Sequence, residues 1–250
     1  MKTAHFFALM VALFSGSIGA EEIYSYPWSG SNYFAKSTGG VGSGIRPSGN
    51  SVTFHLLTDR CVRGNASDTY EDDCDRGIFR SQLQRESELS MNRDLRYNFS
   101  IKDDGVQGLG LRGLGMNIFE IKPYGNASPT VPTFVLYFQP KTRQLLANIV
   151  VTNNVGGTNV HLPNREINTI VGSMKSNWND FQIETKQSAG KDGYIKIRQN
   201  GVLIYEYYGL TSYAHPFGLQ YWFGPYFVVA TLRPVNLTTH WFIVGLMVPS

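Results

Sequence analysis

This chain has little charge, little cysteine and no long apolar run. Charged residues make up 16% of its 250 residues, and the formal net charge is +3. Nucleic acid is therefore not an expected partner, because binding phosphate backbones requires a basic surface. No segment reaches the roughly 18 consecutive apolar residues of a membrane-spanning helix, so we expect no membrane partner. Aromatic residues at 13% and 26 glycines indicate a well-packed, turn-rich protein.

The first 20 residues have the pattern of a secretory signal peptide. Lys2 precedes an apolar stretch from Phe6 to Phe14, and small residues follow it. We therefore expect a secreted, extracellular protein whose mature chain begins near Glu21. Residues 21–250 contain no internal repeat or low-complexity linker, which predicts a single domain. We expect that domain to be monomeric.

Only two cysteines are present, Cys61 and Cys74. In an exported chain they are expected to pair and close one loop, and such a disulfide leaves no thiol to act as a nucleophile. Four Asn-x-Ser/Thr triplets favour a glycosylated eukaryotic protein. Their asparagines are Asn65, Asn98, Asn126 and Asn236.

Helical periodicity is scarce and short alternating segments are frequent, so the chain is predicted to be all-β. The firmest local signal is Asn200-Gly201 between two alternating runs, which predicts a tight β-hairpin. Many short strands separated by Gly, Pro and Asn favour a sandwich of two antiparallel sheets, most simply a jelly roll. The expected strands are Ser51–Leu57, Ile78–Gln84, Asp94–Ile101, Met116–Lys122, Thr133–Phe138, Leu145–Val151, Asp180–Lys186, Tyr194–Arg198, Val202–Tyr207 and Tyr221–Phe227, with a last core strand within Trp241–Val248.

Three of these segments carry polar residues on one face and apolar residues on the other. Side chains alternate across a strand, so each polar set points to the same side. If one sheet bends, these faces line a common groove that suits a sugar chain bearing carboxylates. The sets are Arg80, Gln82 and Gln84; Glu120 and Lys122; and Trp222 and Tyr226.

The sequence gives poor support for hydrolysis. Glycoside hydrolysis needs two carboxylic acids across the scissile bond, whereas Glu120 has Lys122 as its same-face neighbour. No Gly-x-Ser-x-Gly segment supports a serine triad, and the five histidines show no metal-ligand spacing. We expect no catalytic metal and no required cofactor, and leave a structural calcium ion open.

β-Elimination of a uronate chain asks for a different set of groups. Donors must neutralise the carboxylate, a base must remove the adjacent C5 proton, and an acid must protonate the departing oxygen. Arg80 and Gln82 fit carboxylate binding. Lys122 fits either neutralisation or proton removal, and Tyr226 is the natural proton donor or acceptor.

The order of these motifs resembles that of jelly-roll alginate lyases and their glucuronan-lyase and heparin-lyase-like relatives. Those families carry an Arg-Ser-Glu-Leu-Arg type strand, a Gln-Ile-His type strand and a Tyr-Phe-Lys-Ala-Gly-x-Tyr type strand. The corresponding segments are Arg80-Ser81-Gln82-Leu83-Gln84, Glu120-Ile121-Lys122 and Gly224-Pro225-Tyr226. The hairpin at Asn200-Gly201 is similar to the penultimate hairpin of such lyases. The resemblance implies a concanavalin A-like jelly-roll catalytic domain over residues 21–250.

The same resemblance implies a secreted polysaccharide lyase whose partner is an acidic polysaccharide of the alginate or glucuronan type. Position by position, Arg80 would bind the substrate carboxylate, Lys122 would be base or neutraliser, and Tyr226 would be the acid and also a candidate base. Three departures of the chain from these motifs bear on its chemistry. They are Glu120 for Gln, Lys122 for His and Trp222 for Lys.

Simpler interpretations exist for each residue. Arg80 suits a surface ion pair, and Tyr226 suits a half-buried core position. Glu120 and Lys122 suit an exposed same-face ion pair. His55, on a mostly apolar strand, is expected to be a packing residue. The rival functions are a non-catalytic, lectin-like carbohydrate-binding protein on the same fold and a hydrolase with an unrecognised carboxylate pair. The substrate-binding candidates are Gln82, Gln84, Glu120, Trp222 and His55.

Overall fold

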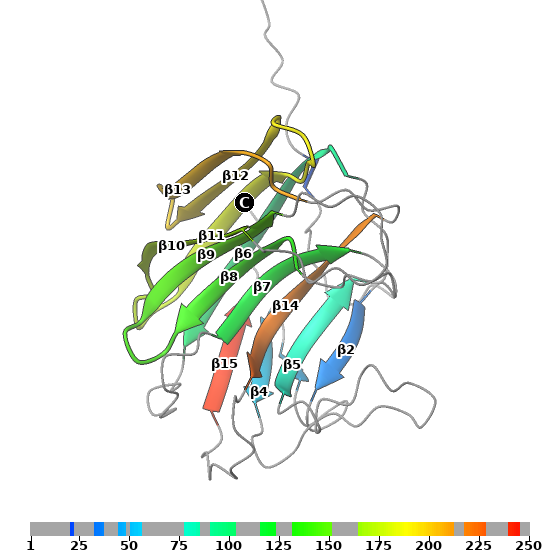
Figure 1. The fold of residues 1–250 in the computed structure, drawn as a ribbon. Helices are drawn as coiled ribbons and strands as arrows, with labels where there is room; N and C mark the ends of the chain where they lie inside the picture. The colour runs from blue at the N-terminus through cyan, green and yellow to red at the C-terminus, as the bar shows by residue number, and fades with distance from the viewer. Residues whose placement is uncertain are drawn as a thin grey trace, which may run out of the picture.

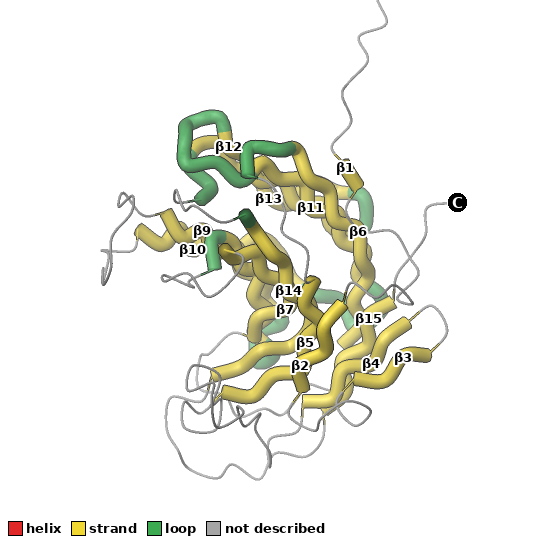
Figure 2. Tube along the Cα trace, turned by 90° about the vertical axis from the view of Figure 1, so that its right-hand side faces the viewer, coloured by secondary structure: helices red, strands yellow, loops and turns green. Residues whose placement is uncertain are grey.

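The structure is a computed structural model. It describes residues 21–22, 33–37, 45–48, 51–56, 78–85, 91–103, 116–123, 132–151, 165–212, 218–228 and 240–245. Every element of regular secondary structure in these ranges is a β-strand. The strands form two sheets packed face to face (Figure 1; Figure 2). The predicted all-β jelly-roll sandwich of two antiparallel sheets is therefore confirmed.

The first sheet has eight strands. The hairpin predicted at Asn200-Gly201 joins two of them, and both residues have positive φ angles of 52° and 79°, as a type I′ turn requires. Across the sheet the order is β13 (Val202–Gly209), β12 (Gly193–Gln199), β11 (Asn179–Lys186), β6 (Asp94–Asp103), β15 (His240–Gly245), β4 (Ser51–Leu56) and β3 (Ile45–Ser48), and β1 (Glu21–Glu22) pairs in parallel with β6.

The second sheet has seven strands, all antiparallel to their neighbours. Its order is β10 (Arg165–Ser173), β9 (Gln144–Val151), β8 (Phe134–Gln139), β7 (Met116–Pro123), β14 (Leu219–Val228), β5 (Ile78–Arg85) and β2 (Tyr33–Ser37). The three segments singled out in the sequence thus become the adjacent strands β7, β14 and β5 (Figure 1).

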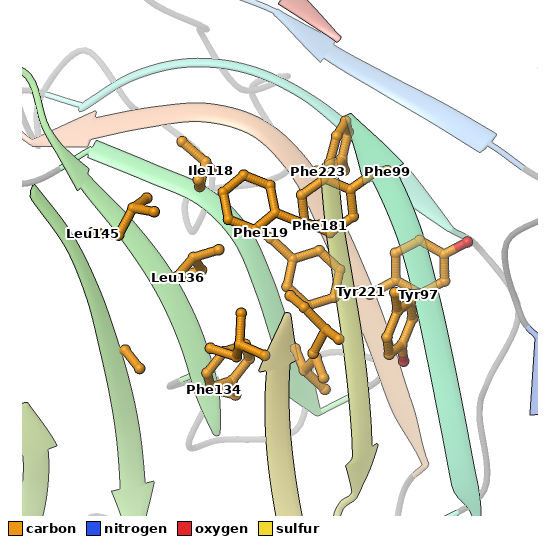
Figure 3. Close-up of a cluster of buried hydrophobic side chains, with 14 of the residues drawn as sticks. Tyr97, Phe99, Ile118, Phe119, Phe134, Leu136, Leu145, Phe181, Tyr221 and Phe223 are labelled. Atoms are coloured by element: carbon orange, nitrogen blue, oxygen red, sulfur yellow. The ribbon is translucent and has the colours of Figure 1, made fainter. Parts of the chain in front are cut away.

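The core lies between the sheets and is rich in aromatic rings (Figure 3). Phe99 of β6 contacts Phe119 of β7 and Phe223 of β14, with ring centroids 5.5 and 4.9 Å apart. Tyr97 of β6 meets Tyr221 of β14 at 5.1 Å. Such contacts add about 0.5–1.5 kcal/mol each to the burial of the rings. Because Phe119 and Ile121 of β7 and Tyr221 and Phe223 of β14 point inward, the residues between them, Glu120 and Trp222, face away from the core.

The predicted strands are confirmed, with ends that differ by a few residues. The segment predicted as Asp94–Ile101 continues to Asp103, and β15 ends at Gly245. Strands β1, β2, β3 and β10 were not among those predicted. The signal peptide, the cysteines Cys61 and Cys74, and the asparagines Asn65, Asn126 and Asn236 lie outside the described residues.

Of the four predicted glycosylation sites, Asn98 lies within the described residues. Asn98 lies on β6, opposite Gln182 of β11, and its side chain is partly exposed. No helix in the described ranges is long and apolar enough to cross a membrane.

Candidate functional site

The register of β5, β14 and β7 brings the predicted polar positions together. Trp222 of β14 pairs with Gln84 of β5 on one side and with Glu120 of β7 on the other. Four residues further along β14, Tyr226 pairs with Arg80 of β5. The three segments therefore meet in one sheet, as the sequence predicted. Their individual chemical roles stay predictions.

A buried carboxylate lies at the centre of this arrangement. Glu120 is 4% exposed. The Nε2 of Gln82 donates a hydrogen bond to its Oε1 at 2.9 Å, and the Nδ2 of Asn117 donates to its Oε2 at 3.3 Å. Burial of a carboxylate is costly unless donors replace its hydration shell, and the two amides do so here. The interpretation of Glu120 as a member of an exposed ion pair is therefore wrong.

Gly224 allows this contact to cross a strand. Gln82 is on β5 and Glu120 is on β7, so their bond passes over β14, which lies between them. The backbone oxygen of Gly224 also accepts a bond from Gln82 Nε2 at 3.4 Å. Gly224 adopts a φ of 114°, a conformation that glycine adopts readily because it has no Cβ.

The amide nitrogen of Gln82 is thus fully engaged. An amide has two N–H donors, and those of Gln82 go to Glu120 and to the Gly224 carbonyl. In this arrangement Gln82 has no N–H left for a substrate carboxylate. Its hydrogen bonds hold the carboxylate of Glu120 against β14.

Asn117 reaches Glu120 because β7 is irregular. Residues three apart on a regular strand point to opposite faces. The pairing of β7 with β8 shifts register between Asn117 and Phe119, and Ile118 and Phe119 both belong to the core. This β-bulge turns Asn117 to the face of Glu120. Sequence reasoning missed Asn117, because counting by two places it in the core.

Lys122 lies over the indole ring of Trp222, with its Nζ 3.7 Å from the ring centroid. Cation–π contacts of this kind contribute roughly 0.5–2 kcal/mol. Trp222 is 2% exposed, whereas Lys122 is partly exposed. One face of the ring is therefore covered, and a sugar can stack on that face only after Lys122 moves aside.

Tyr226 and Lys122 lie on opposite sides of the buried carboxylate. Tyr226 pairs with Asn117 of β7, and Lys122 is five residues further along the same strand. At roughly 3.3 Å per residue the two backbones are about 16 Å apart. The stretch between them carries Glu120, so a ligand that contacts both residues must pass over the carboxylate.

His55 is not part of this site. It lies on β4, which belongs to the first sheet, whereas Arg80, Glu120 and Tyr226 lie on the second. The core separates the two sheets, so the structure does not bring His55 together with the other candidates.

A second carboxylate is not close to Glu120 on the described strands. In the second sheet these strands carry only one other acidic residue, Glu166 of β10. β10 lies three positions from β7, so the backbones are separated by roughly 14 Å or more. Glycosidase carboxyl groups are about 5–9.5 Å apart. Among the described residues no group of three or more His, Cys, Asp or Glu side chains could hold a metal ion.

The fold is shared with solved structures of carbohydrate-active proteins. The endo-β-1,4-glucuronan lyase of the fungus Trichoderma reesei is similar with a TM-score of 0.57 and 12% identity, over 86% of this chain and 85% of that one. An alginate lyase of Pseudomonas aeruginosa has a TM-score of 0.50 and 14% identity, over 81% and 86%. LamA of Zobellia galactanivorans, solved with laminaritriose and laminaritetraose, has a TM-score of 0.50 and 11% identity, over 85% and 89%.

These similarities are at the level of the fold. No protein-family model matches the chain, and no curated protein sequence matches it. Relative to the lyase-type motifs, acid and amide have changed places: the Arg-Ser-Glu-Leu-Arg type strand has Gln82 for Glu, and the Gln-Ile-His type strand has Glu120 for Gln. In this chain the two positions are joined by the hydrogen bond from Gln82 to Glu120.

Proposed function

We propose that this protein is a secreted polysaccharide lyase that cleaves a uronic-acid-containing polysaccharide by β-elimination. Arg80 and Lys122 would bind and neutralise substrate carboxylates, and Tyr226 would transfer the proton. Glu120, Gln82 and their partner Asn117 would hold the centre of the site in shape.

The observation that carries this proposal is the register of β5, β14 and β7. It places an arginine, a tyrosine and a lysine on three adjacent strands around one buried carboxylate. The distance between the strands of Glu120 and Glu166 argues against a hydrolytic carboxylate pair on the described strands of this sheet, because such a pair must flank a single bond. Elimination needs no second carboxylic acid.

The elimination step can be written with one proton carrier. Tyr226 as the phenolate takes the C5 proton, the electron pair forms the double bond between C4 and C5, and the bond from C4 to the departing oxygen breaks. The same tyrosine then gives the proton to that oxygen. Arg80, which pairs with Tyr226, would neutralise the carboxylate on C5 and the charge that develops beside it. Lys122 is too far along β7 to share this proton directly, so its part is to neutralise the carboxylate of a neighbouring uronate.

A second candidate function is a non-catalytic, lectin-like carbohydrate-binding protein. One observation favours it: Gln82 has both N–H donors engaged, and Glu120 adds a negative charge where a uronate must be neutralised. This arrangement weakens the electrostatic stabilisation that elimination requires while leaving sugar binding intact.

The test is to incubate the purified protein with alginate, glucuronan and heparin-like polymers and follow ultraviolet absorbance. A lyase produces a new absorbance band from the unsaturated sugar. New reducing ends without that band would identify a hydrolase. Binding without any product from the whole panel would identify the lectin-like function.

Processing of the chain is part of the same proposal. Removal of residues 1–20, a bridge between Cys61 and Cys74, glycosylation at Asn98 and a monomeric state would suit an extracellular enzyme. Mass spectrometry of the secreted protein, before and after reduction and deglycosylation, measures the first three.

A further inference from the structure

The outer face of the second sheet, turned away from the core, continues from the candidate site towards the edge strand β10. Residues of β7, β8, β9 and β10 pair in register there and form two parallel rows. We call them the amide row and the apolar row. The amide row is Glu120, Val135, Asn148 and Asn168, and the apolar row is Asn117, Tyr137, Leu146 and Ile170.

Both rows are buried at β7 and reach solvent at β10, the amide row only at its last residue. Asn117 is buried, Tyr137 and Leu146 are partly exposed, and Ile170 is 60% exposed. In the amide row Asn148 is 5% exposed, whereas its partner Asn168 is exposed. The site at β7 is thus continuous with a surface that reaches solvent at β10.

This surface differs from the candidate site in its charge. Beyond the starting residue Glu120, neither row contains a charged side chain. The neighbouring part of the face, on β5, β14 and β7, carries Arg80, Glu120 and Lys122. The outer face therefore has a charged half on β5, β14 and β7. The two rows on β8, β9 and β10, which we call the neutral half, carry no charge and border the acidic Glu166 of β10.

Asn148 indicates what the neutral half binds. Its Oδ1 is buried and has no hydrogen-bond partner among the described residues. A buried acceptor of this kind needs a donor, and a sugar hydroxyl is one. Beside it, the apolar row offers Tyr137, Leu146 and Ile170 to the C–H face of a ring. Amides on one side and apolar groups on the other match the two faces of an uncharged sugar.

We propose that the β8–β9–β10 surface is a subsite for neutral sugar units, so that the substrate is a heteropolysaccharide in which neutral sugars adjoin the uronate that reacts. The inference rests on the proposed function for the uronate itself. A second uronate over the neutral half would lose hydration without gaining a cation from the described strands, which is costly. Neutral units have no such cost.

Binding tests this proposal without requiring activity. The probes are two oligoglucuronates of equal length, one unmodified and one with part of its carboxyl groups reduced to alcohols. Asn148→Leu should weaken calorimetric binding of the reduced probe about tenfold and leave that of the unmodified probe unchanged. Gln182→Leu, an amide change on the outer face of the first sheet, should alter neither. Equal loss for both probes, or no loss, overturns the proposal.

A second variant adds a charge to the neutral half and should shift the binding preference towards the unmodified probe. Ile170→Lys adds a cation at an exposed position and should strengthen binding of the unmodified probe while weakening the preference for the reduced one. An unchanged preference contradicts the subsite. Asn148→Leu should fold, because it removes an unpartnered buried oxygen. If no polymer yields unsaturated product, the proposed lyase function fails, and the binding preferences of wild type and variants still decide this inference.

Discussion

The outer faces of the two sheets hold their charges in different ways. On the first sheet, cross-strand ion pairs join Arg96 to Glu184 at 2.7 Å and Lys196 to Glu206 at 3.4 Å, and these side chains remain between 20% and 39% exposed. On the second sheet, Glu120 is buried and bound by amides. Solvated ion pairs contribute little to the free energy of folding and are ordinary features of a protein surface. A buried carboxylate held by neutral donors has no such simple stabilising role, which is why we place the function on the second sheet.

The largest expected effect is that of Tyr226→Phe on activity. Loss of the phenolic proton carrier should lower the rate of unsaturated-product formation by roughly 10²–10⁴-fold, with an unchanged unfolding transition. The control is Tyr208→Phe on the first sheet, where the side chain is 61% exposed and activity should be retained. Full activity of the Tyr226 variant would remove this residue from the mechanism.

Replacing Glu120 tests the buried carboxylate. Glu120→Leu leaves the amides of Gln82 and Asn117 without their acceptor, and each unsatisfied buried group costs about 1–3 kcal/mol. Denaturant unfolding should show a loss of roughly 2 kcal/mol or more. The matched change Glu184→Leu, which breaks an ion pair on the first sheet, should cost less than about 1 kcal/mol. Equal losses would mean that the two faces do not differ.

Replacing Lys122 measures the next effect. Lys122→Met keeps an apolar stem over Trp222 but removes the charge, so binding of a polyuronate should weaken about tenfold, and tryptophan fluorescence should change. Lys196→Met, whose charge lies 5.7 and 5.4 Å from the ring centroids of Tyr194 and Tyr208, should leave polyuronate binding unchanged. If the Lys196 variant loses as much affinity, the polyuronate does not bind specifically to the second sheet.

The smallest effect belongs to an exposed ion pair on the first sheet. Hydrogen bonds from Lys186 and Ser188 lower the pKa of Asp192 to about 2. A carboxyl group whose pKa is lower in the folded state stabilises the fold above its unfolded pKa of about 4 and loses that contribution as pH falls through the folded value. The melting temperature of Asp192→Asn should therefore lie slightly below wild type at neutral pH. The difference should vanish between about pH 4 and pH 2, and a constant difference would contradict the ion pair.

The sequence predicted the strands well, because alternation and turn residues are local signals. Asn200-Gly201 and the polar faces at Arg80 and Glu120 are examples. It could not predict that Gln82 passes over Gly224 to reach Glu120, because that contact joins residues on strands separated by a third. His55 shows the same limit. Its residue type and its predicted strand are both compatible with a binding site, but the strand belongs to the other sheet. Which sheet a strand joins depends on long-range pairing.

The β-bulge in β7 changes which residues of this strand share a face. After it, Glu120 and Lys122 share a face at a spacing of two, and across it Asn117 and Glu120 share that face at a spacing of three. A related chain that lost one of the two successive core residues, Ile118 or Phe119, would regain regular alternation, and the residue at the position of Asn117 would still share the face of Glu120, now at a spacing of two. A sequence pattern for this site must therefore allow a spacing of three, with the bulge, or of two, without it, before the carboxylate, and a spacing of two after it.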